Sequence, residues 1–208
     1  MTQVYSYQPY LNTNLGHHYG YLMPMLAKIL PPPDKSIKIL DLGCGNGSFT
    51  QYLSQQGFEA VGIDPSESGI ALAQKNFPEA KFIQGDIYDL PFDRLENQFD
   101  YIVSIDVIEH LYLPRIMPQV AKRCLKPHGK LIITTPYHGY LKNIVLSAAG
   151  KFDHHVNPLW DGGHIKFFSV KTLSQLLNTE GFQNLEFHFA GRLPWLWKDM
   201  ICVAHQPG

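Results

Sequence analysis

The chain has 208 residues, of which 45% are apolar and 17% charged, the balance expected of one soluble globular domain. Its formal charge of −1 comes from scattered charged residues, so nothing indicates a broad nucleic-acid-binding face. Its three cysteines are odd in number and widely spaced, so neither a disulfide framework nor a zinc knuckle is indicated, and no apolar run approaches the ~20 residues that cross a membrane. Because the N-terminus also lacks a signal-peptide pattern, we expect a cytoplasmic protein with reduced thiols.

The first 35 residues are polar and aromatic, with one helical pattern from Tyr19 to Leu30 that ends at three prolines. We interpret residues 1–35 as a helical cap on a main domain spanning 36–208. From residue 36 on, short apolar strands alternate with helices, which predicts βαβ units and a parallel, doubly wound α/β sheet. The strands are expected at 37–42, 60–63, 81–84, 99–105, 130–135, 185–189 and 200–204, and the helices at 48–56, 67–77, 114–125 and 172–179.

Residues 137–168 interrupt this alternation. They are rich in glycine, histidine and aromatic residues, with one short apolar piece from Ile144 to Ala149. Long irregular segments of this kind are often functional lids. We therefore expect residues 137–168 to form a lid or insertion on the side of the domain where a substrate would bind.

The strongest local signal is the sequence ILDLGCGNG over residues 39–47, in which an apolar strand runs into three glycines. Glycine permits tight turns and close approach of a ligand, and ligands of open α/β sheets bind beyond the carboxyl ends of the strands. A dinucleotide fingerprint would require glycine or alanine where Ser48 stands, and Asp41 would repel a pyrophosphate. Asp41 instead suits a ligand with a positive amino group, such as S-adenosylmethionine (SAM).

Two further acids follow the next strands. Asp64 ends the second strand, where it can accept hydrogen bonds from both ribose hydroxyls, although it also resembles a residue that starts a helix before Pro65. Asp86 follows the third strand and could accept from an adenine amino group while Ile87 packs on the ring; alone, it would pass for a turn residue. Their order behind the glycine loop favours a nucleoside site.

Five blocks between about Ile37 and Pro136 resemble the class I SAM-dependent methyltransferases: ILDLGCGNG, VGIDPS, GDIYDLPF, FDYIVSIDVIEHL and LKPHGKLIITTP. The resemblance implies a Rossmann-like seven-stranded sheet, mostly parallel with the last strand antiparallel, and helices on both faces. The implied cofactor residues are Gly43, Gly45 and Gly47 for the methionine part, Asp41 for the loop or the amino group, Asp64 for the ribose, Asp86 and Ile87 for the adenine, and the backbone around Ile105 and Asp106 beneath the cofactor.

A second candidate site lies in the DVIEH sequence over residues 106–110 and at the distant His164. This pairing resembles ubiquinone-pathway O-methyltransferases and small-RNA 2′-O-methyltransferases, whose motif E-x-x-E-H with a distant histidine can hold a divalent metal. The resemblance implies a metal site of Asp106, Glu109, His110 and His164, with Asp106 here in place of glutamate. Three interpretations stay open: a metal that activates an acceptor hydroxyl, catalysis by His110 as general base beside Glu109, and side chains that merely pack.

The acceptor pocket is expected in the variable parts of the chain, namely residues 1–30, 137–168 and the tail around Trp195 and Trp197. Their aromatic content suits a small, flat or apolar molecule, with Tyr5, Tyr19 and Tyr140 placed to shield it or the cofactor. The leading hypothesis is therefore O-methylation of a small molecule, aromatic molecules included. N- or C-methylation and a non-catalytic SAM-binding module are the alternatives, and the sequence leaves the acceptor and the oligomeric state open.

Overall fold

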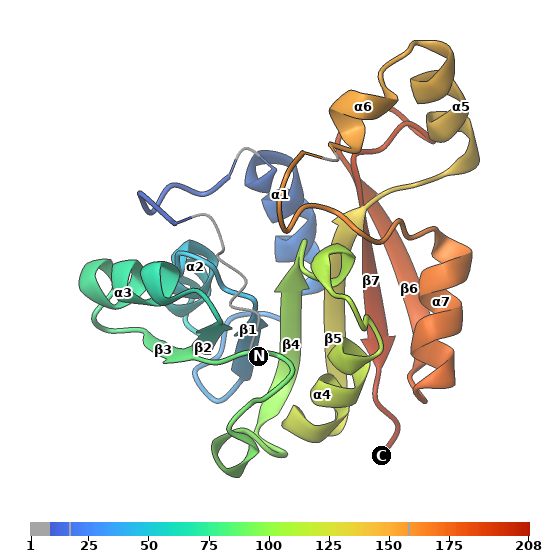
Figure 1. The fold of residues 1–208 in the computed structure, drawn as a ribbon. Coiled ribbons are helices and arrows are strands. Elements are labelled where there is room, and N and C mark those ends of the chain that lie inside the picture. Colours follow the sequence, from blue (N-terminus) through green and yellow to red (C-terminus); the bar gives the residue numbers. More distant parts are fainter. Residues whose placement is uncertain (1–8, 17, 158) are drawn as a thin grey trace.

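A computed structural model describes residues 9–16, 18–157 and 159–208, in which one seven-stranded sheet carries helices on both faces (Figure 1). The strands are β1 (Lys38–Leu42), β2 (Glu59–Asp64), β3 (Lys81–Gln84), β4 (Phe99–Ile105), β5 (Leu125–Pro136), β6 (Gln183–Ala190) and β7 (Asp199–His205). Their order is β3-β2-β1-β4-β5-β7-β6, with parallel pairing from β3 to β5. The last strand, β7, lies antiparallel between β5 and β6, which confirms the expected mixed sheet.

The helices begin and end close to the residues at which the sequence predicts their ends. Ser66 accepts a hydrogen bond from the Gly69 N–H at the start of α3, and Gly57 ends α2 in a left-handed conformation with φ of 103°. The helical elements are α1 (Tyr19–Ile29), α2 (Ser48–Gln56), α3 (Glu67–Asn76), η1 (Phe92–Arg94), η2 (Ile108–His110), α4 (Ile116–Cys124), α5 (Tyr140–Ala148), α6 (Phe152–His155) and α7 (Val170–Thr179).

Every helix among the described residues is too short to span a bilayer. The longest, α1, has 11 residues, whereas a crossing needs ~20 apolar ones.

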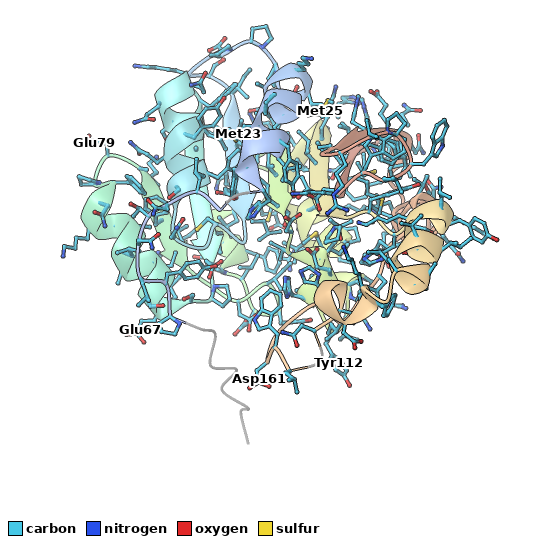
Figure 2. The ribbon with its side chains drawn as sticks, turned by 90° about the horizontal axis from the view of Figure 1, so that it is seen from above. Met23, Met25, Glu67, Glu79, Tyr112 and Asp161 are labelled. Atoms are coloured by element: carbon cyan, nitrogen blue, oxygen red, sulfur yellow. The ribbon has the colours of Figure 1, made fainter. Side chains whose placement is uncertain are left out.

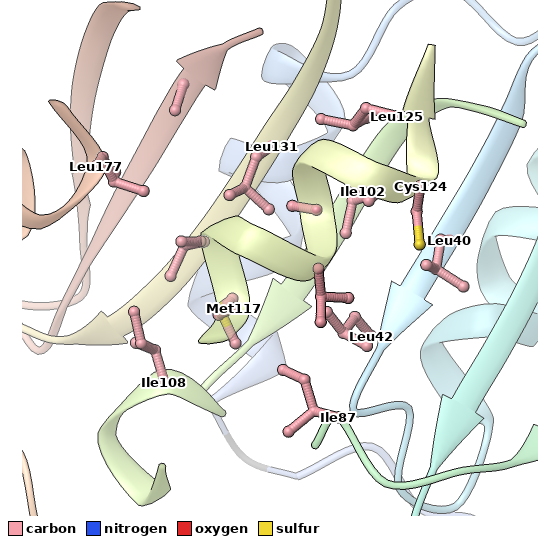
Figure 3. Packing of buried hydrophobic residues seen from close by; sticks show 14 of the residues in the cluster. Leu40, Leu42, Ile87, Ile102, Ile108, Met117, Cys124, Leu125, Leu131 and Leu177 are labelled. Atoms are coloured by element: carbon pink, nitrogen blue, oxygen red, sulfur yellow. The ribbon is translucent and has the colours of Figure 1, made fainter. Parts of the chain in front are cut away.

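Side chains that alternate along the central strands fill two cores on opposite faces of the sheet. Leu40 and Ile102 join the core beneath α4 and α7, whereas Ile39 and Val103 join the core beneath α1 and α2. This division follows from strand geometry, because successive residues of a strand point to opposite faces. Figure 3 shows the first core, in which α4 lies over the strands.

The predicted N-terminal cap contributes to the second core. Leu22 and Leu26 of α1 are fully buried there beside Phe49 of α2. Residues on both sides of the predicted boundary at residue 35 therefore pack in the same core. The division into cap and main domain stays a prediction. Tyr5 lies outside the described residues. Within the predicted lid, residues 137–168, the structure places α5 and α6, which lie together beyond the upper end of the sheet (Figure 1).

The strand order brings the carboxyl ends of β1, β2, β4 and β5 to one edge of the sheet. The chain moves outward from β1 to β2 and β3, and then returns to the other side of β1 with β4. In doubly wound folds, ligands bind at such a reversal point. Figure 2 looks down on this edge, with Glu67 at the start of α3 on one side and Tyr112 and Asp161 on the other.

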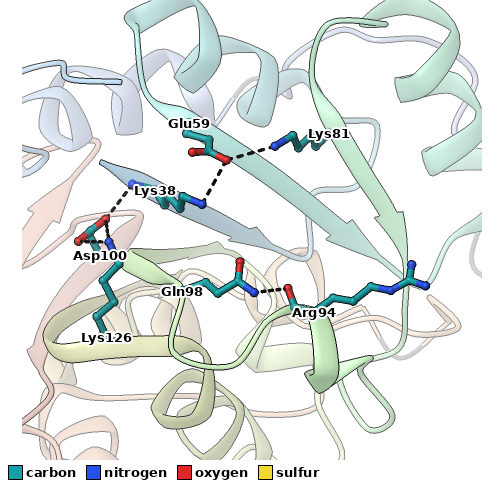
Figure 4. Close-up of polar contacts among 7 residues, drawn as sticks. All are labelled: Lys38, Glu59, Lys81, Arg94, Gln98, Asp100 and Lys126. Carbon is teal, nitrogen blue, oxygen red and sulfur yellow. Dashed lines mark hydrogen bonds and ion pairs between the residues drawn. The ribbon is translucent and has the colours of Figure 1, made fainter. Parts of the chain in front are cut away.

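The opposite, amino edge of the sheet is held by ion pairs (Figure 4). Asp100 accepts two contacts of 2.8 Å from Lys126 Nζ and one of 2.9 Å from the Lys38 N–H, which joins the starts of β1, β4 and β5. Glu59 pairs with Lys81 at 3.2 Å, beside a surface hollow of about 510 Å³. This hollow lies away from the reversal point at the carboxyl edge, so we do not assign the functional site to it.

Replacing Asp100 with alanine should lower the free energy of unfolding by about 1–2 kcal/mol, because it removes a partly buried ion pair and a backbone acceptor together. Chemical denaturation checks this value. The matched control is Glu96→Ala, which breaks the more exposed 3.4 Å pair with Arg123 and should change stability by less than about 0.5 kcal/mol. An equal effect of both substitutions would contradict the role given to Asp100.

Candidate functional site

The glycine loop after β1 is built on left-handed backbone. Gly43, Gly45 and Gly47 have φ of 89°, 54° and 79°, a region that side chains with a Cβ rarely adopt. A Cβ on Gly43 would collide with Val107, and one on Gly47 would lie 2.7 Å from the Phe82 ring. Protein neighbours therefore fill the space beside Gly43 and Gly47, so the glycines are needed first for the turn and its packing.

Asp64 ties the end of β2 to this loop. Its Oδ2 accepts from the Gly45 N–H and its Oδ1 from the Ser66 N–H, both at 2.8 Å. Each carboxylate oxygen has a second lone pair, so the group can still accept from two hydroxyls. Burial raises the pKa of Asp64, while the two N–H groups oppose that shift. This geometry fits the ribose role, which stays a prediction.

Asp41 lies deeper, under the glycine loop. It is 1% exposed, and its Oδ2 accepts a 2.6 Å hydrogen bond from Thr50 Oγ1 of α2. Desolvation raises the pKa of Asp41 to about 7, partly opposed by the Thr50 hydrogen bond. Of the two expected roles, the bond to Thr50 matches fixing the loop. A role with the cofactor's amino group stays a prediction.

The remaining residues expected at the cofactor lie along the same edge. Asp86 is exposed after β3, where its Oδ1 accepts from the Tyr88 N–H at 3.0 Å in a local turn. Ile87 is 8% exposed and Ile105, at the end of β4, is 7% exposed. An acid at the end of β2, an apolar side chain after β3 and a buried carboxylate beneath the loop together fit SAM.

The second candidate site forms where the loop after α6 meets η2. The N–H groups of Ile165 and Lys166 both donate to the Glu109 carbonyl oxygen, at 2.9 and 3.0 Å. His110 Nδ1 lies 2.7 Å from the Gly162 carbonyl oxygen. Because a carbonyl only accepts, Nδ1 carries a proton, and in the neutral ring the lone pair is on His110 Nε2. These contacts bring two segments more than 50 residues apart into one site.

Glu109, His110 and His164 form a cluster whose candidate ligand atoms lie within 4.8 Å of one another. Glu109 is fully buried, and its Oε2 accepts from Thr135 Oγ1 at 3.0 Å. Its Oε1 lies 3.9 Å from His164 Nε2 and has no hydrogen-bond partner among the described residues. Burial, reinforced by the charge of Asp106, raises the pKa of Glu109 well above its ordinary value.

The structure does not bring Asp106 into this cluster, so the expected set of four metal ligands is reduced to three. Asp106 has a left-handed backbone with φ of 52°, and its Oδ1 accepts from Thr134 Oγ1 at 2.6 Å. These constraints hold the carboxylate against β5. Burial, with a contribution from Asp199, raises the pKa of Asp106 to about 7.

Sequence reasoning missed a buried polar group beside Asp106. Lys142 of α5 and Asp199 of β7 are each 4% exposed, and Lys142 Nζ donates to the Lys198 carbonyl oxygen at 3.2 Å. Burial raises the pKa of Asp199, and the Tyr21 side chain and Lys142 oppose that shift. Burial lowers the pKa of Lys142 to about 8. No local motif marks these residues, because they come from three distant elements.

Comparisons with known proteins identify the family of this chain. A profile described as a methyltransferase domain matches residues 15–186. The chain belongs to this methyltransferase family. Within it, the chain is 36% identical over 131 residues to a mouse mitochondrial ubiquinone biosynthesis O-methyltransferase, covering 60% of this chain and 32% of that protein. It is 29% identical over 178 residues to the Azorhizobium caulinodans ubiquinone biosynthesis O-methyltransferase, covering 83% and 67%.

The chain also resembles solved structures. The PH0226 protein of Pyrococcus horikoshii OT3 superposes with a TM-score of 0.69 at 25% identity, covering 95% of this chain and 94% of that one. A Haemonchus contortus phosphoethanolamine N-methyltransferase in complex with SAM gives 0.67 at 18% identity, covering 89% and 52%, which shows a shared fold. The chain spans about a third of the mouse relative's length and two thirds of the bacterial one's.

Replacing Asp41 with asparagine should flatten the pH dependence of stability. The unfolded carboxyl titrates near ~4 and the folded one at about 7, so the folded state holds its proton more tightly. The resulting stabilisation is complete below pH ~4 and is lost as pH rises to about 7. Asparagine can still accept from Thr50 but cannot ionise.

Thermal unfolding without SAM, at pH 5 and at pH 8, measures this effect. The fall in melting temperature between the two pH values should shrink by about 3 °C or more in Asp41→Asn. Asp93→Asn, at a carboxyl whose side chain is 76% exposed, is the control and should keep the wild-type fall. An unchanged pH profile in Asp41→Asn would show that Asp41 does not titrate in this range.

Proposed function

We propose that this protein transfers the methyl group of SAM to a hydroxyl oxygen of a small-molecule acceptor. The observation that carries the proposal is the juxtaposition of two groups at adjacent strand ends. The glycine loop with Asp64 follows β1 and β2, and Glu109 with His110 follows β4. The proposed nucleoside site and the proposed base would thus lie on either side of the reversal point in the strand order.

His110 is proposed as the catalytic base. Its Nδ1 is engaged by the Gly162 carbonyl, so its Nε2 is the atom with a free lone pair for a proton. SAM supplies a methyl group already activated by its sulfonium. As the acceptor oxygen forms a bond to the methyl carbon, the carbon–sulfur bond breaks and the hydroxyl proton moves to His110 Nε2. The enzyme's main contribution beyond this is alignment of the reactants.

Several features support a small acceptor with aromatic character. The Trp160 ring lies 5.5 Å from the His110 ring and 5.4 Å from the His164 ring, centroid to centroid, beside the proposed base. The relatives named as ubiquinone biosynthesis O-methyltransferases support oxygen as the methylated atom. The net charge of −1 offers little attraction to nucleic acid. Nitrogen or carbon acceptors and a non-catalytic SAM-binding role are the outcomes that would replace this proposal.

A divalent metal at the Glu109, His110 and His164 cluster is the second candidate. It is favoured by the mutual distances of the three ligand atoms and by the buried Oε1 of Glu109, which has no hydrogen-bond partner among the described residues and is the kind of group a cation satisfies. Such a metal would lower the pKa of an acceptor hydroxyl held against it. Two histidines and one carboxylate suit Zn²⁺, Mn²⁺ or Fe²⁺ better than Mg²⁺.

His110→Ala should reduce turnover at least about 100-fold while SAM affinity changes by less than about twofold, because the residue would move a proton without holding the cofactor. Calorimetry with SAM, and with NADH as the competing class of cofactor, measures binding; methyl transfer to a panel of phenols and other hydroxyl compounds measures turnover. If SAM affinity and turnover fell by the same factor, His110 would not be the catalytic base. Binding of NADH without SAM would remove the whole proposal.

Titration of the SAM-free protein with Mn²⁺ or Zn²⁺ separates the metal from the base. A bound metal should give a binding heat that EDTA reverses and that His164→Ala weakens at least about tenfold, because one ligand in three is lost. His128→Asn, at an exposed position of β5 whose left-handed backbone asparagine tolerates, is the matched control. Equal metal affinity in the wild type and His164→Ala would exclude the site.

A further inference from the structure

Residues 9–16 lie across the glycine loop, at the end of the sheet where the cofactor site is proposed. In Figure 1 this segment, which we call the strap, is the blue loop before α1. Four hydrogen bonds join the strap to the proposed cofactor side. They run from Asn46 Nδ2 to the Asn12 and Asn14 carbonyl oxygens at 3.0 and 3.2 Å, from Ser48 Oγ to the Thr13 carbonyl oxygen, and from the Tyr10 N–H to Ser68 Oγ at 3.2 Å.

Tyr10 is the side chain that the strap brings to the loop. Its hydroxyl oxygen lies 2.7 Å from the point where a Cβ on Gly45 would stand, and its Cδ2 lies 3.0 Å from the same point on Gly69. The ring therefore sits between the glycine loop and the first turn of α3. Gly43 and Gly47 face residues of the main domain, whereas Gly45 faces the strap.

The two segments that Tyr10 touches are the ones that hold Asp64. One Asp64 oxygen accepts a hydrogen bond from the Gly45 N–H. The other accepts one from the N–H of Ser66, three residues before Gly69. A ligand that uses the remaining lone pairs of Asp64 must therefore lie close to the Tyr10 ring. The ring would also present an aromatic surface to a ligand that carries a sulfonium and an ammonium, both of which aromatic faces attract.

We infer that Tyr10 is a cofactor-contact residue, that the strap holds its ring as the outer wall of the SAM site, and that the strap opens when SAM or its product is exchanged. This inference rests on the proposed function, because it requires a SAM site at the glycine loop. It adds a residue of the N-terminal segment to a site otherwise built from strand ends.

Tyr10→Ala should raise the SAM dissociation constant about tenfold, mostly through faster dissociation, because it removes one wall of the site. The dissociation rate is measured by chasing bound radiolabelled SAM with excess S-adenosylhomocysteine. Tyr10→Phe keeps the ring and should stay within about threefold of wild type. Leu11→Ala is the control on the same strap, because Leu11 is 85% exposed and its substitution should not affect either value.

A second measurement follows the strap itself. Hydrogen exchange of peptides covering residues 9–16 should slow when S-adenosylhomocysteine is added to the wild-type protein. Asn46→Asp keeps an acceptor for the Ser48 N–H but cannot donate to the Asn12 and Asn14 carbonyls. Exchange of the strap should therefore be faster in Asn46→Asp than in the wild type. Identical exchange with and without S-adenosylhomocysteine would overturn the inference.

Calorimetry of the wild type with SAM separates the inference from the function on which it rests. If the wild type does not bind SAM, the proposed function and the inference both fail. If the wild type binds SAM and Tyr10→Ala binds equally well, the inference alone fails. Tighter binding by Tyr10→Ala would also overturn it, because Tyr10 would then obstruct the site instead of forming its wall.

Discussion

The candidate cofactor site depends on the hydrogen bonds that Asp64 makes to the Gly45 and Ser66 N–H groups. They fix the glycine loop after β1 relative to the start of α3, because one carboxylate accepts hydrogen bonds from both segments. The parallel pairing of β1 and β2 makes this possible, because it brings both carboxyl ends to the same edge.

Buried carboxyl groups are concentrated at this edge. Asp41, Asp106 and Glu109 come from the β1 and β4 ends, and burial raises the pKa of each one. Burying several acids together destabilises their ionised forms. A core that served packing alone would not require this cost. A cationic ligand would offset part of that cost. The arrangement is therefore more consistent with a binding edge than with a purely structural one, and it complements the sulfonium chemistry proposed above.

The acceptor side is assembled differently from the cofactor side. The residues proposed to bind the cofactor follow strands directly, so their positions are set by the sheet. Glu109, His110 and His164 meet because the loop over residues 162–166 is hydrogen-bonded to η2. A site built from a loop and a short turn can vary without disturbing the core, which fits a fold whose members act on different acceptors.

The sequence by itself determined most strands of the sheet, their parallel direction from β1 to β5 and the position of the glycine loop, because apolar runs, their alternation with helices and helix capping are local properties of the chain. The antiparallel last strand was expected only through the resemblance. It also singled out Glu109, His110 and His164, through a resemblance rather than through geometry. Only the tertiary structure showed that Asp106 accepts a hydrogen bond from Thr134 and that Lys142 interacts with Asp199. Only the tertiary structure placed Tyr10 on Gly45. These contacts join residues far apart in the chain, and no periodicity or spacing records which distant side chains will meet.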